Sequence, residues 1–243
     1  MRTRLTLAAA LLLAFSLHAA ELTVDEILAK NTAARGGAGK LAAVKSMRLT
    51  GKLSVAGMEG PFTMIKKRPQ MFKVEFTIGG MTGAQAYDGT SGWMMMPFMG
   101  QKEPGPMPGD MLAAMKEQSD FDGPFIDYAK KGNKVELLGQ ADVAGSPAYK
   151  LRLTTKDGQE ATVYLDAATF LETRIEARRQ MQGQEVETET TFGNYREVEG
   201  LLFPFSVESK AKGAPGGQTF TFEKAEINPA LEDAAFRMPV KAQ

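Results

Sequence analysis

From Ser46 onward the chain alternates polar and apolar residues in short segments separated by turn residues, and this pattern constrains the fold more than any other feature. Residues 48–55 (RLTGKLSV) are typical of it. Successive side chains of a strand point to opposite faces, so the alternation predicts strands with one buried face. Turns such as Gly79-Gly80 and Asp88-Gly89 follow closely on one another, which predicts a meander of antiparallel strands.

The alternation and the turn residues along the rest of the chain predict a mainly β (α+β) protein. One large, strongly curved antiparallel sheet of about 11–12 strands would have two or three helices against its concave side. A capping box at Thr23 and Glu26 begins a predicted helix over residues 24–34, and a second helical turn is expected over 40–44. The strands are predicted over residues 48–55, 62–67, 71–78, 82–87, 92–96, 134–138, 148–154, 161–165, 171–181, 186–195, 203–209 and 218–225.

The pattern is interrupted between residues 97 and 134. Pro104, Pro106 and Pro108 are expected to exclude a regular strand there. Asp110 is then predicted to cap a helix that carries an apolar stripe, and residues 121–125 form an aromatic, irregular loop. The whole insertion is a candidate cover for the sheet.

The first 20 residues have the layout of a secretory signal peptide: two arginines, an apolar run and small residues. The run is too short to cross a bilayer, which takes roughly 20 apolar residues. Removal of residues 1–20 would leave 21–243 as a single domain with 27 basic and 29 acidic residues. No cysteine is present for lipid modification, so we expect a soluble protein of the periplasm, with no transmembrane segment after signal removal.

Composition argues against several classes of function. His18, the only histidine, lies in the expected signal peptide, and there is no cysteine. Zinc sites built on His or Cys and Ser-His-Asp triads are therefore excluded from the mature chain. The near balance of charge gives no footprint for nucleic acid or anionic membranes. We expect no metal, no cofactor and no enzymatic activity.

Methionine is concentrated in one part of the chain. Twelve of the 15 methionines lie between Met47 and Met115, and the densest stretch is residues 93–99 (WMMMPFM). Methionine is flexible and polarisable, and it suits surfaces that must fit variable apolar partners. The clustering is consistent with an apolar binding surface and equally with ordinary filling of a core.

Three other patterns indicate structure rather than chemistry. Residues 120–127 (DFDGPFID) contain acids but lack the ligand spacing of a calcium loop, so we interpret them as turn and cap residues. Residues 36–40 (GGAGK) lack the flanking residues of a phosphate-binding loop and are interpreted as a helix stop. Glu185 and Glu187 share a face of a plainly alternating strand, which predicts a solvated face.

The chain resembles bacterial outer-membrane lipoprotein-sorting proteins of the LolA/LolB-like superfamily. The likeness covers nearly the whole mature chain in order, but it brings no short catalytic or binding signature. It rests on residues 27–53 (ILAKNTAARGGAGKLAAVKSMRLTGKL), 85–99 (QAYDGTSGWMMMPFM), 118–135 (QSDFDGPFIDYAKKGNKV), 164–174 (YLDAATFLETR) and 192–207 (FGNYREVEGLLFPFSV).

The resemblance implies a half-open β-barrel whose helices cover an apolar cavity for the acyl chains of lipoproteins or related lipids. The leading hypothesis is therefore a periplasmic carrier or chaperone in outer-membrane lipoprotein sorting, with membrane-bound donor and acceptor proteins as candidate partners. The alternatives are an envelope lipid-sensing regulatory module and a small-molecule enzyme that uses neither metal nor histidine. The predicted cavity residues are Phe62, Met64, Met81, Trp93, Met95, Phe98, Met111, Met115, Phe121 and Phe125.

Overall fold

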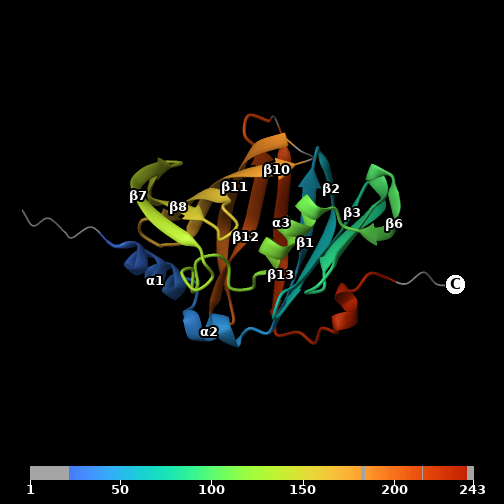
Figure 1. Cartoon of the computed structure of the whole chain (residues 1–243), viewed down its shortest axis with the longest axis horizontal. Helices are drawn as coiled ribbons and strands as arrows, with labels where there is room; N and C mark the ends of the chain where they lie inside the picture. Colours follow the sequence, from blue (N-terminus) through green and yellow to red (C-terminus); the bar gives the residue numbers. More distant parts are fainter. Residues whose placement is uncertain (1–21, 182–183, 215, 240–243) are drawn as a thin grey trace, which may run out of the picture.

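The computed structural model describes residues 22–181, 184–214 and 216–239, and the expected signal peptide lies outside them. The described strands form one antiparallel sheet in the order β6-β5-β4-β3-β2-β1-β13-β12-β11-β10-β9-β8-β7 (Figure 1). The strands are β1 (Ser46–Val55), β2 (Met58–Lys67), β3 (Met71–Ile78), β4 (Met81–Tyr87), β5 (Gly92–Met96), β6 (Gln101–Pro106), β7 (Lys134–Val143), β8 (Ser146–Thr154), β9 (Glu160–Asp166), β10 (Glu172–Met181), β11 (Gln184–Val198), β12 (Leu201–Ala211) and β13 (Gly217–Ile227).

The sheet consists of two meanders, β1–β6 and β7–β13, each of which follows chain order. They join where β1 pairs with β13, for example at Met47 and Ile227. β6 and β7 are the two edges and do not pair with each other, so the sheet is curved but not closed (Figure 1). The predicted fold class, a mainly β protein with a large antiparallel sheet, is confirmed.

The sheet has thirteen strands rather than 11–12, because β6 runs through the segment where prolines were expected to exclude a strand. That expectation was wrong for a physical reason. β6 is an edge strand that pairs only with β5, at Trp93↔Pro106 and Met94↔Gly105. Proline is tolerated at an edge, where its missing N–H can face away from the ladder.

Three α-helices accompany the sheet: α1 (Val24–Ala34), α2 (Ala38–Ala43) and α3 (Gly109–Ser119). The predicted capping box is present, since the Glu26 carboxylate accepts from the Thr23 N–H at 2.8 Å. The helix stop is confirmed at Gly36, whose φ is 116° and where a Cβ would overlap the Gly200 carbonyl oxygen. Asp110 does not occupy the N-cap of α3. Pro108 does, and the Asp110 carboxylate accepts instead from the Met111 N–H at 2.9 Å.

We call the face that carries Leu49, Phe62 and Leu151 the inner face, because the apolar sides of α1 and α3 pack on it. The opposite, outer face is covered near β3 by a short 3-10 helix, η2 (Asp233–Phe236). On the inner face, α1, which precedes β1 in the chain, packs at the β7–β9 end, and α3, which lies between β6 and β7 in the chain, contacts β3 and β4.

The chain must cross a face of the sheet between β6 and β7, because these strands are at opposite edges. It crosses the inner face. Met115 of α3 packs on the β3–β5 end, Phe121 contacts a small cluster around α2 and Leu201, and Phe125 reaches the β8–β9 end. The insertion at residues 97–133 thus spans the inner face from one end to the other.

Candidate functional site

The centre of the inner face is an apolar surface built from strands alone. Its buried residues are Leu49, Leu53, Phe62, Ile78, Phe205 and Phe222, and every apolar residue that packs against them also comes from a strand. Phe62 lies edge-on to Phe220 and Phe222, with ring centroids 5.1 and 5.2 Å apart. We call this set, with its partly exposed neighbours Val207 and Phe220, the central apolar surface.

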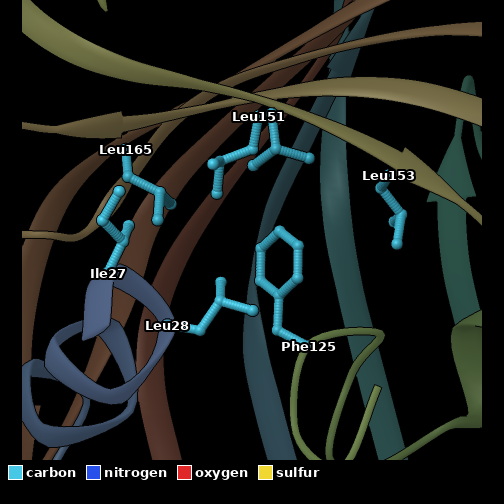
Figure 2. Packing of buried hydrophobic residues seen from close by; sticks show 7 residues of the cluster. Ile27, Leu28, Phe125, Leu151, Leu153 and Leu165 are labelled. Carbon is cyan, nitrogen blue, oxygen red and sulfur yellow. The ribbon is translucent and has the colours of Figure 1, made fainter. Parts of the chain in front are cut away.

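The β7–β9 end of the inner face is a closed aliphatic core. Ile27 and Leu28 of α1 meet Leu151, Leu165 and neighbouring side chains, and Phe125 of the insertion completes the packing (Figure 2). Ile27, Leu151 and Leu165 have no exposed surface. The interior of this core therefore offers no space for a ligand.

The β3–β5 end is rich in methionine. Four of the six residues in its buried cluster are methionines: Met94, Met96, Met107 and Met115. Met64, Val74 and Phe76 contact both this cluster and the central apolar surface. The central apolar surface and the methionine-rich end are therefore continuous, and α3 covers the methionine-rich end.

The structure divides the predicted cavity residues among several places. Phe62 and Met64 lie at the central surface, and Met111 and Met115 face the methionine-rich end. Met81 and Phe98 are 43% and 41% exposed at the far end of β4, where the Phe98 ring lies 5.7 Å from Phe76. Phe121 lies in the cluster beside α2, and Phe125 belongs to the closed aliphatic core.

The prediction was wrong for Trp93 and Met95, which lie on the outer face with Ala84 and Ala86. The Trp93 indole N–H donates to the Phe236 carbonyl at 2.9 Å, and Phe236 itself is fully buried. Both faces of β5 are apolar because the C-terminal segment covers the outer one. Alternation alone could not say which face of residues 92–96 was covered by which segment.

Charged side chains gather at the end of the inner face where β2 finishes and the insertion crosses. Arg68 forms a two-pronged ion pair with Asp122, and its guanidinium lies 4.6 Å above the Phe121 ring. This pairing holds the pKa of Asp122 below its usual value. Lys131 donates to Asp120 at 2.6 Å. The acids of the 120–127 segment thus fasten the insertion, a larger role than the turns and caps expected for them.

Lys66 lies at the candidate site but was not among the residues predicted from the sequence. It lies on the inner face two positions from Met64, and its ammonium is 5.5 Å from the centre of the Phe72 ring. Burial lowers its pKa to about 8, the nearby Arg35 adds to this, and Asp120 acts in the opposite direction. The sequence could have indicated it, because Lys66 alternates with Phe62 and Met64 along one strand and so shares their face.

An apolar hollow, open to solvent, lies beside α1. It measures about 650 Å³ and is lined by Leu28, Ala29, Phe125, Ile126 and Tyr128, among others. It opens between the helix and the insertion, away from the central apolar surface.

In the part of the chain that the structure describes, no group of acidic, His or Cys side chains is placed to hold a metal ion. None of the helices described is long and apolar enough to cross a membrane. Glu187 is exposed and paired with Lys212 and Arg178, which confirms the solvated face predicted for that strand.

Solved structures share this architecture. A LolA superfamily protein from Nitrosomonas europaea aligns with a TM-score of 0.60 and 14% identity, over 89% of this chain and 98% of its own. The chain has the LolA-like fold. An outer membrane lipoprotein-sorting protein domain from Vibrio parahaemolyticus gives 0.54 at 13% identity, over 87% and 94%.

A DUF1329 family protein from Desulfovibrio piger aligns with a TM-score of 0.58 and 11% identity, over 88% of this chain and 97% of its own. No protein-family model and no curated protein matches the sequence. The LolA-like fold is therefore established through structure, and the three alignments each cover 87–89% of this chain.

Proposed function

We propose that this protein is a periplasmic carrier that holds acyl chains of lipoproteins or related lipids against the central apolar surface. The observation that carries the proposal is the composition of that surface: aromatic and aliphatic side chains from β1, β2, β3, β12 and β13, with no helix residue among them. Val207 and Phe220 on it remain partly exposed. The other six residues of the surface are 3–8% exposed, so a ligand would add its cover at these two partly exposed side chains.

Acyl chains match this surface in chemistry and in energy. Each buried methylene contributes about 0.8 kcal/mol, so ten carbons give roughly 8 kcal/mol before entropy costs. Micromolar binding corresponds to about 8 kcal/mol net, so an acyl chain longer than ten carbons is needed to reach it once the entropy costs are subtracted. A carrier must also release its cargo, and the adjoining methionines suit a cover that repacks around chains of different shape.

The setting we propose follows from the sequence. Residues 1–20 would act as a signal peptide, and residues 21–243 would work as one lipid-binding domain in the periplasm. The lipoprotein-sorting domain with the same fold supports a place in outer-membrane lipoprotein sorting, with membrane-bound donor and acceptor proteins as partners.

The test is native mass spectrometry of the mature protein from its own periplasm, with extraction and identification of bound lipid. A matched pair of variants locates the site. Val207→Glu puts a charge on the central apolar surface, whereas Ser206→Glu puts the same charge on the neighbouring residue, which points to the outer face.

Bound lipid or lipoprotein in the wild type and in Ser206→Glu, with loss in Val207→Glu, supports the proposal. Val207→Thr, which is milder, provides a folded comparison if the glutamate variant does not accumulate. A lipid-free wild type that stays unchanged when lipoprotein or lipid is added would refute the carrier and favour a module that senses envelope lipids through a protein partner.

A further inference from the structure

Positive charge is in excess at one end of the central apolar surface. Arg35, Lys66, Arg68 and Lys131 gather there around two carboxylates, those of Asp120 and Asp122. Arg68 is taken up by Asp122 and Lys131 by Asp120. Among the residues described, Arg35 and Lys66 form no ion pair, so two cations lack a dedicated counterion.

Lys66 is held in this position by the sheet. It pairs with Met47 of β1 and Phe72 of β3, in the interior of the first meander. The Phe72 ring below its ammonium is itself buried, and a cation over an aromatic face is favourable but does not replace an anion. Lys66 is half-buried, and Asp120, the carboxylate that acts on it, is already bound to Lys131. A ligand that brings an anion would offset the remaining cost of desolvating the Lys66 ammonium.

Arg35 is fixed near Lys66 by the end of α1. Its carbonyl accepts from the Leu202 N–H at 3.1 Å, and the adjoining Gly36 packs against the β11–β12 turn at Gly200. The charge of Arg35 is close enough to Lys66 and Asp122 to influence both of their pKa values. Two separate elements, α1 and β2, thus bring positive charge to the same place.

The apolar surface begins directly beside this charge. Lys66, Met64 and Phe62 alternate along β2 and point to the same face, and alternate residues of a strand are about 6.6 Å apart. Lys66 is therefore about 13 Å along the strand from Phe62 at the centre of the apolar surface. This arrangement, a cation at one end of an apolar track, is complementary to an anionic amphiphile.

We propose that Lys66, assisted by Arg35, binds the phosphate or carboxylate group of an anionic lipid whose acyl chain lies along Met64 and Phe62 on the central apolar surface. The inference rests on the proposed carrier function and adds the class of ligand: anionic amphiphiles in preference to neutral ones.

The experiment compares two probes with the same chain, lauroyl lysophosphatidylglycerol and the neutral 1-lauroylglycerol, by calorimetry at pH 7 with the mature protein. The variants are Lys66→Met, Lys66→Arg and, as a matched control, Lys52→Met. Lys52 lies on β1 but points to the outer face, where it pairs with Glu59. Inorganic phosphate is the third probe. Thermal unfolding of each variant checks that it is folded.

We expect the wild type and Lys52→Met to bind the anionic probe about tenfold more tightly than the neutral one, because a charge-assisted contact is worth roughly one decade. Lys66→Met should lose this preference and keep its affinity for 1-lauroylglycerol, while Lys66→Arg should retain most of it. Inorganic phosphate alone should bind far more weakly than the lysolipid.

Equal binding of the two probes by the wild type, or a preference that survives in Lys66→Met, would overturn the inference and leave the carrier intact. Phosphate bound as tightly as the lysolipid would overturn it as well, since the site would then serve a free anion. Failure of the wild type to bind either amphiphile would remove the carrier proposal itself.

Discussion

The two helix-covered ends of the inner face bury different kinds of side chain. At the β7–β9 end α1 buries branched aliphatic side chains, and Asn31 fastens the helix by donating to the Phe170 carbonyl at 2.8 Å. At the β3–β5 end α3 buries mostly methionine and begins at Pro108 without a side-chain cap. Branched side chains specify one packing, whereas methionine accommodates several. The first end is a fixed core, and the second is an adaptable cover.

The largest effect should come from breaking the fixed end. Leu151→Ala removes a fully buried side chain from the aliphatic core and should lower the free energy of unfolding by about 4 kcal/mol. Acyl-chain binding by the molecules that remain folded should not change, because this core lies outside the central apolar surface. Urea denaturation and lipid titration measure the two quantities.

Leu138→Ala is the control, since that side chain is 40% exposed on the β7 edge and its loss should cost little. A Leu151→Ala variant that loses lipid affinity at unchanged stability would show that the aliphatic end takes part in binding, and the contrast between the two ends would fail.

The next effect concerns Lys66, a half-buried cation whose ammonium lies over Phe72 of the methionine-rich end. The folded pKa of Lys66, about 8, lies below the ordinary lysine value of 10.5. Below pH 8 both the folded and the unfolded chain carry the proton, so folding bears the full cost of burying the charge. Between pH 8 and 10.5 the unfolded chain binds more protons, and this cost disappears as the pH rises.

Lys66→Met should therefore be more stable than the wild type by up to about 3 kcal/mol at pH 7, and the difference should shrink by pH 10. Asp120 and Arg35, the charged groups that act on Lys66, are present in both proteins, so the comparison isolates the lysine. Urea denaturation of both at pH 7 and pH 10 measures it. A difference that does not depend on pH would mean that Lys66 keeps an ordinary pKa.

The contrast also shows what could be predicted from the sequence. Helix α1 and strands β3 and β5 were predicted to the residue, because a capping box and clean alternation are local signals. The LolA-like architecture was anticipated from segments spread along the chain. Whether β6 forms depends on its being an edge, and that is a property of the whole sheet which prolines in a window cannot reveal.

The predicted site was harder to locate for the same reason. Phe125 and Met115 are both large apolar residues of one insertion, yet they pack at opposite ends of the inner face. Trp93 was misplaced because a C-terminal residue, Phe236, covers its side of β5. Lys66 was overlooked because its significance arises from Arg35, which is brought near only by the docking of α1.

A smaller effect tests the adaptability of the methionine-rich end. Met115→Leu keeps the volume of a buried side chain and should cost less than about 1.5 kcal/mol in unfolding free energy. If the flexibility of the methionine side chains serves ligand binding, Met115→Leu should discriminate more strongly among acyl chains of different length, because a branched side chain repacks less readily. Calorimetry with lysolipids of 10 to 16 carbons as probes reads this out.

The smallest effect should come from the helix start that distinguishes α1 from α3. Thr23→Ala removes the capping box and should cost about 1 kcal/mol, because Thr23 accepts from the Glu26 N–H at 3.3 Å and the Glu26 carboxylate reaches back to it. The cost should be local: hydrogen exchange of the first turn of α1 should accelerate toward the rate of α3, while the buried strands β8 and β9 stay protected. Thr32→Ala in the same helix, which makes no cap, should leave exchange unchanged. If α3 already exchanges as slowly as capped α1, the packing of methionine alone fixes that helix, and the cover would have to open by moving the whole insertion rather than by loosening α3.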